Sequence, residues 1–266
     1  MDKRPIGIFD SGVGGLTVVK QVIKALPNED TIYFGDTARV PYGSKSKETV
    51  TEFSRQIMRF LIKNDVKAVI IACNTVSSNC FEALRAEFDL PITEVVGPGV
   101  ESCLAATKNG RVGVIGTQAT INSRAYENGI KAKDSSIKVF QKACPLFVPL
   151  AEEGFTENDI AKLTVKTYLQ ELKEKNIDTL ILGCTHYPML KKTIGEFMGD
   201  EVHIVDPAME TARSMKSCLE KLSMTGEEKE GSHIFYCSDN CKQFNAICKK
   251  NLGLECRVHK VNIEKY

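Results

Sequence analysis

The sequence predicts an α/β protein of two pseudo-symmetric domains, each a mostly parallel sheet flanked by helices, with the active site in the cleft between them. Short apolar runs alternate with segments of helical periodicity along most of the chain, which is typical of parallel sheets covered on both faces. The pattern then starts again. Gly7 and Gly113 are 106 positions apart, and Cys73 and Cys184, each at the end of an apolar run, are 111 positions apart. Near-equal offsets favour two similar units over one continuous domain.

In the first half, strands and helices alternate regularly. Leu16, Val19, Val22, Ile23 and Leu26 fall on one face of a helix that ends before a proline, and similar periodicity follows twice more. We expect strands at 7–9, 31–34, 69–71 and 91–96, and helices at 16–26, 50–61 and 75–88. A loop with proline and glycine is expected at 37–44.

The second half repeats this alternation less regularly. We expect strands at 111–117, 137–140 and 179–182, and helices at 119–129 and 156–173. The segment 144–150 is apolar but twice interrupted by proline, so we expect a loop with a buried lining. A helix running to residue 222, a strand at 233–237 and a helix at 240–250 complete the chain. We expect the tail to pack back on the first half, which gives domains of 1–96 plus 208–266, and 97–207.

The composition is that of a globular protein with no charge bias. The 266 residues are 42% hydrophobic and 26% charged, with a net charge of +1, so neither nucleic acid nor a membrane is an expected partner. The apolar run near the N-terminus is too short for a signal peptide, and we expect a cytoplasmic protein.

Ten cysteines in such a chain are expected to be mostly buried free thiols. Cys237, Cys241, Cys248 and Cys256 cluster near the end and raise the question of zinc. They contain no CxxC pair, and Cys241 and Cys248 suit one face of a helix, so the pattern favours packing and no metal.

Cys73 and Cys184 are the residues that most clearly indicate chemistry. Each follows an apolar run and precedes residues that can begin a helix, so each thiol is expected at the ligand-binding end of a strand. A helix N-terminus stabilises a thiolate, which can remove a proton, while a neutral thiol can return one. Two thiols on opposite faces of a planar carbanion would invert a stereocentre. The alternative is that both are ordinary buried cysteines. The polar residues at 74–75 and 185–186 weaken this alternative, because they place hydrogen-bonding groups beside each thiol.

Other polar residues are placed to assist these thiols. Asp10 can act near Cys73, whereas Glu152 and His186 can act near Cys184. The turn at 10–15 has neither the third glycine of a dinucleotide-binding motif nor the Lys-Ser/Thr of a phosphate loop. Its free N–H groups could hold a carboxylate, although a turn needed only for tight packing fits its spacing equally well. Asp36 and Arg39 could line the cleft or form a surface ion pair.

Four motifs in order resemble the signatures of the glutamate racemase family. They are Asp10-Ser11-Gly12-Val13-Gly14-Gly15-Leu16, Asp36-Thr37-Ala38-Arg39-Val40-Pro41-Tyr42-Gly43, Ala72-Cys73-Asn74-Thr75 and Gly183-Cys184-Thr185-His186-Tyr187-Pro188. The resemblance runs essentially end to end. It implies a cofactor-independent 1,1-proton transfer that interconverts L- and D-glutamate and supplies D-glutamate for peptidoglycan. Relatives are often dimers, so a homodimer is expected.

The resemblance also implies residue roles. The Cys73 position handles the α-proton of D-glutamate and the Cys184 position that of L-glutamate, assisted by Asp10, Glu152 and His186. The substrate would be held by side-chain or backbone groups of Asp10, Ser11, Tyr42, Gly43, Ser44, Asn74, Thr75, Thr117, Thr185 and His186.

Three other functions are weighed against this interpretation. An aspartate or other amino-acid racemase would use the same chemistry. A thiol–disulfide oxidoreductase should carry a close cysteine pair such as CxxC, which neither Cys73 nor Cys184 has. A nucleotide-binding module should show an intact phosphate loop, which is missing.

Overall fold

The computed structural model describes residues 1–226, 229–253 and 256–266. Within them, strands form two parallel sheets, one of six strands in the order β10-β9-β2-β1-β3-β4 and one of four in the order β6-β5-β7-β8. The strands are β1 (Ile6–Asp10), β2 (Thr31–Gly35), β3 (Ala68–Ile71), β4 (Ile92–Glu94), β5 (Arg111–Gly116), β6 (Lys138–Ala143), β7 (Thr179–Gly183), β8 (His203–Val205), β9 (His233–Cys237) and β10 (Val258–Lys260). The predicted α/β class with two parallel sheets is confirmed.

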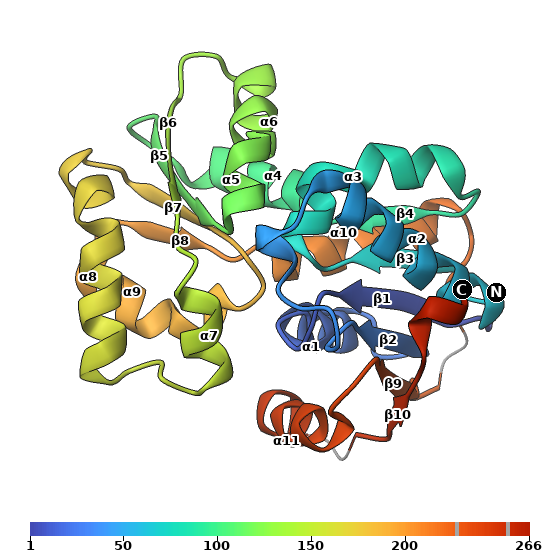
Figure 1. The fold of residues 1–266 in the computed structure, drawn as a ribbon. Helices are drawn as coiled ribbons and strands as arrows, with labels where there is room; N and C mark the ends of the chain where they lie inside the picture. The colour runs from blue at the N-terminus through green and yellow to red at the C-terminus, as the bar shows by residue number, and fades with distance from the viewer. Residues whose placement is uncertain (227–228, 254–255) are drawn as a thin grey trace.

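Helices cover both faces of each sheet. The helices are α1 (Leu16–Ala25), α2 (Lys47–Lys63), α3 (Asn74–Glu87), α4 (Val96–Ala106), α5 (Gln118–Ser123), α6 (Ala125–Lys133), α7 (Phe147–Glu152), α8 (Asp159–Glu174), α9 (Lys191–Met198), α10 (Ala208–Lys221) and α11 (Cys241–Leu252). Short 3₁₀ helices are η1 (Tyr42–Ser44), η2 (Tyr187–Leu190) and η3 (Ile263–Lys265). We call the six-stranded sheet with α1–α3, α10 and α11 the first lobe, and the four-stranded sheet with α4–α9 the second lobe. Figure 1 shows the two lobes side by side, with both chain ends in the first.

The two sheets share one internal order. In the first lobe β1 lies between β2 and β3, with β4 beyond β3, and in the second β5 lies between β6 and β7, with β8 beyond β7. β1 and β7 are fully buried apolar strands, as expected for sheets covered on both faces. This correspondence explains the repeated pattern in the sequence, because β3 and β7 are equivalent strands and each delivers one of the two cysteines.

The core is divided in the same way. In the first lobe, α1, α10 and α11 pack on one face of the sheet and α2 and α3 on the other. In the second lobe, α7–α9 pack on one face and α4 and α6 on the other. The chain passes from the first sheet to the second between β4 and α4, and returns between β8 and α10. The domain boundaries of 1–96 plus 208–266, and 97–207, stay a prediction.

Several elements differ from the sequence prediction. The segment expected to be a loop at 144–150 contains α7, because Pro149 falls in the first turn of the helix, where the missing N–H has no partner to lose. The single helix expected at 119–129 is two helices, since Arg124 has a left-handed φ of 55°. α4, β8, α9 and β10 were not predicted. α4 contains two glycines and a proline near its start, which hide its periodicity.

Two of the four C-terminal cysteines are joined by a disulfide. Cys248 and Cys256 form a disulfide, which the expectation of packed free thiols did not foresee. Cys237 and Cys241 are free, with their sulfurs 2.7 Å apart. Cys248 is also buried in the core of the first lobe, so packing is part of its role. In the described part of the chain, no helix combines the length and the apolar character needed to cross a membrane.

Candidate active site

The two cysteines lie at equivalent strand ends. Cys73 follows β3 and is the residue that caps α3. Cys184 follows β7 but is succeeded by the short 3₁₀ helix η2 rather than by an α-helix. The predicted helix N-terminus is therefore present at Cys73 and absent at Cys184, where other groups must stabilise a thiolate.

Both thiols line one cavity between the lobes. Its volume is about 30 Å³, and its lining comes from loops after β1, β2, β3, β5 and β7. The lining residues are Ser11, Val40, Pro41, Tyr42, Gly43, Cys73, Asn74, Thr75, Thr117, Val148, Cys184, Thr185 and His186. One water molecule occupies roughly 30 Å³ in the liquid, so the cavity as it stands is too small for an amino acid.

The cavity gathers most of the predicted site residues but not all. Asp10 and Glu152 lie behind it, each bonded to a residue that lines it. Ser44 is exposed and does not line it, because it lies at the far end of η1. Val40, Pro41 and Val148 line the cavity and were not predicted, since apolar loop residues carry no chemical signal in a sequence.

The Cys73 side of the cavity carries negative charge. Cys73 is 4% exposed, and its thiol donates to Ser11 Oγ at 3.7 Å. Burial, together with the nearby carboxylate of Asp10, raises the pKa of Cys73 far above its ordinary value. The thiol at Cys73 therefore keeps its proton in the resting site.

Asp10 is held in place from two sides. Its Oδ2 accepts from the backbone N–H of Gly15 at 2.6 Å and from the hydroxyl of Thr185 at 3.3 Å. Its Oδ1 is buried and finds no hydrogen-bond partner among the described residues. A buried carboxylate oxygen without a donor is an unmet acceptor.

On the Cys184 side, polar contacts run from Cys184 through His186 to Glu152. The sulfur of Cys184 lies 3.9 Å from His186 Nδ1, and His186 Nε2 lies 3.0 Å from Glu152 Oε1. Burial alone would lower the pKa of His186, but the bonds to Cys184 and Glu152 outweigh it and raise the pKa to about 10. His186 is therefore an imidazolium at neutral pH, and a cation beside a sulfur stabilises negative charge on it.

The two sides are thus alike in position and opposite in charge. A neutral thiol stands near a carboxylate on one side, and a sulfur stands near an imidazolium on the other. This is the combination that a proton transfer needs, because one group can accept a proton while the other already holds one.

Polar contacts join the lobes around the cavity. Thr75 and Thr117 share a hydrogen bond of 2.9 Å, and the hydroxyl of Tyr126 donates to Asn74 Oδ1 at 2.6 Å. The backbone of the first lobe also approaches the second lobe closely at Gly43. A Cβ placed on Gly43 would lie 2.5 Å from Thr117 Cβ, so only glycine allows this approach.

A second glycine contact lies on the other side of the cavity. A Cβ on Gly14 would lie 2.5 Å from His186 Nδ1. Gly14 lies in the glycine-rich turn, whose spacing suited an anion site and tight packing equally, although the polar residues Asp10 and Ser11 favoured a site. The contact shows that the turn packs tightly against the second lobe.

Asp36 and Arg39 occupy neither of their expected places. Both are absent from the lining of the cavity, and the Asp36 carboxylate is fully buried and bonded to Arg39 Nε at 2.6 Å. The pair is therefore not a surface ion pair. It lies beneath the loop that supplies Tyr42 and Gly43.

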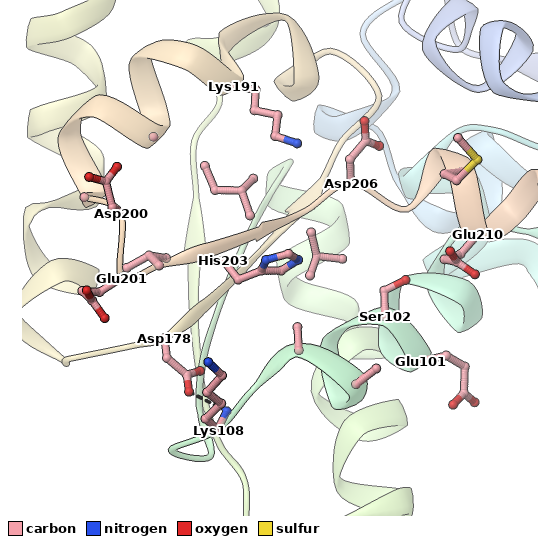
Figure 2. Close-up of a pocket in the computed structure, with 18 of the residues that line it drawn as sticks. Glu101, Ser102, Lys108, Asp178, Lys191, Asp200, Glu201, His203, Asp206 and Glu210 are labelled. Atoms are coloured by element: carbon pink, nitrogen blue, oxygen red, sulfur yellow. Dashed lines mark hydrogen bonds between the residues drawn. The ribbon is translucent and has the colours of Figure 1, made fainter.

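A much larger cavity, of about 1550 Å³, lies away from the thiols. Figure 2 shows its lining from α4, β8, α9 and α10, with Asp178 bonded to Lys108. The labelled side chains are mostly acidic, and none of them belongs to the thiol cavity. Convergent titratable groups with shifted pKa values mark an active site better than volume does, so we assign the site to the smaller cavity.

Comparisons with known proteins agree with this fold and site. The sequence matches the Asp/Glu/Hydantoin racemase family over residues 6–215. The chain therefore belongs to the Asp/Glu/hydantoin racemase family and is an isomerase. Within this family, its full-length relatives are glutamate racemases. That of Geobacter metallireducens is 53% identical over 256 residues, covering 95% of this chain and 94% of its own.

Solved structures give the same result. A glutamate racemase isoform from Bacillus anthracis superposes with a TM-score of 0.95 at 36% identity, covering 98% of each chain. The glutamate racemase from Francisella tularensis, in complex with D-glutamate, superposes with a TM-score of 0.93 at 41% identity, covering 100% of each chain.

Proposed function

We propose that this chain interconverts L- and D-glutamate by moving the α-proton between Cys73 and Cys184, without a cofactor. The observation that carries the proposal is the pair of thiols, delivered by equivalent strands of two similar sheets into one small polar cavity. The full-length relatives are glutamate racemases, and one solved structure holds D-glutamate.

In the L-to-D direction, the sulfur of Cys184 acts as the base. It takes the α-proton of L-glutamate as a thiolate, and the C–H electron pair stays on the α-carbon as a planar carbanion. The thiol of Cys73 then delivers its proton to the opposite face, which completes the inversion and leaves Cys73 as the thiolate. The D-to-L direction runs these steps in reverse. At the α-carbon one C–H bond breaks and one forms, while the Cys184 S–H bond forms and the Cys73 S–H bond breaks, so no oxidant or reductant is needed.

The flanking residues have unequal tasks in this mechanism. His186 balances the charge on Cys184 and connects it through a hydrogen bond to Glu152, whose side chain is partly exposed. A proton can therefore reach solvent on that side. Asp10 opposes negative charge on Cys73, which favours the form that donates. Its Oδ1 has no hydrogen-bond partner among the described residues, and we assign it the ammonium group of the substrate.

Closed lobes supply the remaining catalytic requirement. The α-proton of an amino acid is weakly acidic, so the carbanion needs fixed hydrogen bonds and the exclusion of water. We propose that Ser11, Tyr42, Gly43, Asn74, Thr75, Thr117 and Thr185 provide these bonds through side-chain or backbone groups. Ser44 is exposed, and we assign it only backbone contact through the turn that it ends.

The biological setting follows from this chemistry. Both site cysteines are free thiols, which suits a reducing compartment although Cys248 and Cys256 form a disulfide, and we place the enzyme in the cytoplasm, supplying D-glutamate to peptidoglycan synthesis. We also propose a homodimer. Leu146, Phe155, Ile160 and Leu163 are exposed apolar residues in or beside α7 and α8, and their burial would favour association. Light scattering should give twice the chain mass of 29.4 kDa; the mass of one chain would reject the dimer.

Incubation of the purified protein with each glutamate enantiomer in D₂O tests the function. No cofactor is added, and circular dichroism and α-proton NMR are recorded together. Both enantiomers should lose optical activity and take up deuterium at the α-carbon. A protein that exchanges the α-proton of neither enantiomer is not a racemase.

A further inference from the structure

Asp36 is a buried carboxylate for which the proposed chemistry has no use. It follows β2 and is 0% exposed. A buried carboxylate is costly unless it is paired and hydrogen-bonded. Asp36 meets this condition through three partners. Its Oδ2 accepts from Arg39 Nε at 2.6 Å and from the Tyr42 hydroxyl, and its Oδ1 accepts from Ser238 Oγ at 2.8 Å.

These partners come from separate parts of the first lobe. The backbone N–H of Asp36 donates to the carbonyl of Asp10 at 3.1 Å, which connects it to the strand end before the glycine-rich turn. Ser238 follows β9 and binds the backbone N–H of Ala38 at 2.8 Å. Asp36 therefore joins the end of β1, its own loop and the start of the β9–α11 connection.

The charge of Asp36 is balanced within the lobe. Arg39, which neutralises it, lies over the ring of Phe53 at 3.9 Å and donates to Gln56 Oε1 at 2.5 Å. Both partners of Arg39 belong to α2. The ion pair is thus fastened to a long helix, and the carboxylate oxygens have a fixed position.

Tyr42 is the contact between this fixed carboxylate and the cavity. Burial, together with the charge of Asp36, raises the pKa of Tyr42 well above its ordinary value, so its hydroxyl keeps its proton and donates. The ring of Tyr42 packs on Phe53 at 5.6 Å between centroids. Tyr42 begins η1 and lines the thiol cavity together with Gly43.

We propose that Asp36 is a positioning residue that fixes η1 through the Tyr42 hydroxyl. In this role it sets where the backbone of Tyr42 and Gly43 meets a carboxylate of the bound amino acid. The ligand assignment rests on the proposed function. Neither Asp36 nor the Tyr42 hydroxyl is hydrogen-bonded to the sulfur of Cys73 or Cys184, whose contacts are with Ser11 and His186. Loss of the hydroxyl–carboxylate bond should therefore weaken substrate binding more than it slows proton transfer.

A double-mutant cycle tests this role. Asp36→Asn keeps the size of the side chain but removes its charge, and Tyr42→Phe removes the hydroxyl but keeps the ring on Phe53. Each change should raise KM for D-glutamate by about tenfold, while kcat changes by less than about threefold. Because Asp36→Asn weakens the bond that Tyr42→Phe removes, the double variant should be no worse than the poorer single variant.

Ser238→Ala is the matched control. It removes a bond to the same carboxylate, at the oxygen that faces away from η1, and should leave KM within about twofold of the unchanged protein. A purely structural role for Asp36 would lower the unfolding temperature of Asp36→Asn and of Ser238→Ala while leaving KM unchanged.

Three outcomes would overturn the proposal: an unchanged KM in Tyr42→Phe, a loss confined to kcat, or effects that multiply in the double variant. If Asp36→Asn does not fold, Tyr42→Phe alone decides, because it leaves the Asp36–Arg39 pair intact. Turnover of glutamate by the wild-type protein distinguishes a failure of this proposal from a failure of the proposed function. If it turns over glutamate, the function holds whatever KM the variants show, and if it does not, the function fails first.

Discussion

At the scale of single residues, the two thiols differ in their surroundings more than in their positions. Cys73 lies near the carboxylate of Asp10, and Cys184 lies near the imidazolium of His186. A racemase has an equilibrium constant of one, so kcat/KM must be equal in the two directions. The difference between the thiols can therefore appear only in the separate values of kcat and KM, and in how each proton exchanges with solvent.

The charge of His186 can be measured directly. The chain contains four histidines, so ring signals in an NMR titration can be assigned by substitution. The pKa of His186 is raised to about 10, and its ring should stay protonated through neutral pH and titrate near pH 10. Glu152→Gln removes one of the groups that raise this pKa, so the midpoint should move to lower pH. A midpoint near 6.5 in the unchanged protein would contradict the charge assignment.

Sequence reasoning found residues that carry chemical signals and missed those that do not. Cys73, Cys184 and His186 were predicted from polar residues at strand ends, and all three line the cavity. Val40 and Val148 line it without any such signal. Asp36 was expected to line the cleft or to form a surface ion pair, but it is buried and absent from the cavity lining. The sequence could not show this, because its partner Ser238 is about 200 positions away.

At the scale of elements, two close approaches fix how the lobes meet. Gly43, in η1, contacts Thr117 at the start of α5, and Gly14 contacts His186. These contacts lie on either side of the cavity that contains the thiols. Closure therefore depends on two positions that have no room for a side chain.

Gly43→Ala should impair closure. Its Cβ would lie 2.5 Å from Thr117 Cβ, so one lobe must shift, and kcat/KM should fall by about tenfold or more. The control is Gly195→Ala in α9, where a Cβ would make ordinary contact with Ile204 at 3.5 Å. Steady-state kinetics should show a loss in Gly43→Ala and none in Gly195→Ala. Equal activity in both variants would exclude the contact as a determinant of closure.

A buried ion pair fastens the start of β3. Lys67 Nζ lies 2.6 Å from Glu29 Oε2 and donates to the carbonyl of Asp2 at 2.8 Å, and both side chains of the pair are almost fully buried. Lys67→Ala leaves the Glu29 carboxylate buried without its cation. The free energy of unfolding should fall by about 3–5 kcal/mol, as measured by urea denaturation.

The control for this change is an exposed pair. Lys192 binds Glu157 at the surface, and Lys192→Ala should change the free energy of unfolding by less than about 1 kcal/mol. Equal losses in the two variants would mean that burial does not determine the strength of the Lys67 pair.

Element prediction succeeded where apolar periodicity was undisturbed. The buried strands β1, β3 and β7 and the long helices α2 and α8 were all expected from their patterns. α7 was predicted to be a loop because of Pro149, yet proline is tolerated in the first helical turn. The position of a helix start is set by tertiary packing around Phe147, which a single sequence does not display.

At the scale of the whole molecule, two similar sheets bring equivalent strand ends together. The orders β2-β1-β3-β4 and β6-β5-β7-β8 correspond strand by strand. The sequence signal of this arrangement was that Gly7 and Gly113 are separated by nearly as many positions as Cys73 and Cys184. The cavity of about 30 Å³ is too small for glutamate, so we expect the lobes to open to admit it. Closure then excludes water from the carbanion.

The central claim is that each thiol serves one face of the substrate, and the single-cysteine variants test it most directly. Cys73→Ala and Cys184→Ala are each incubated with each glutamate enantiomer in D₂O, and circular dichroism and α-proton NMR are followed together. Racemisation should fall by about 10²–10⁴-fold in both variants. Cys73→Ala should still exchange the α-proton of L-glutamate only, and Cys184→Ala that of D-glutamate only. Full racemisation by either variant, or exchange of both enantiomers by one thiol, would contradict the account.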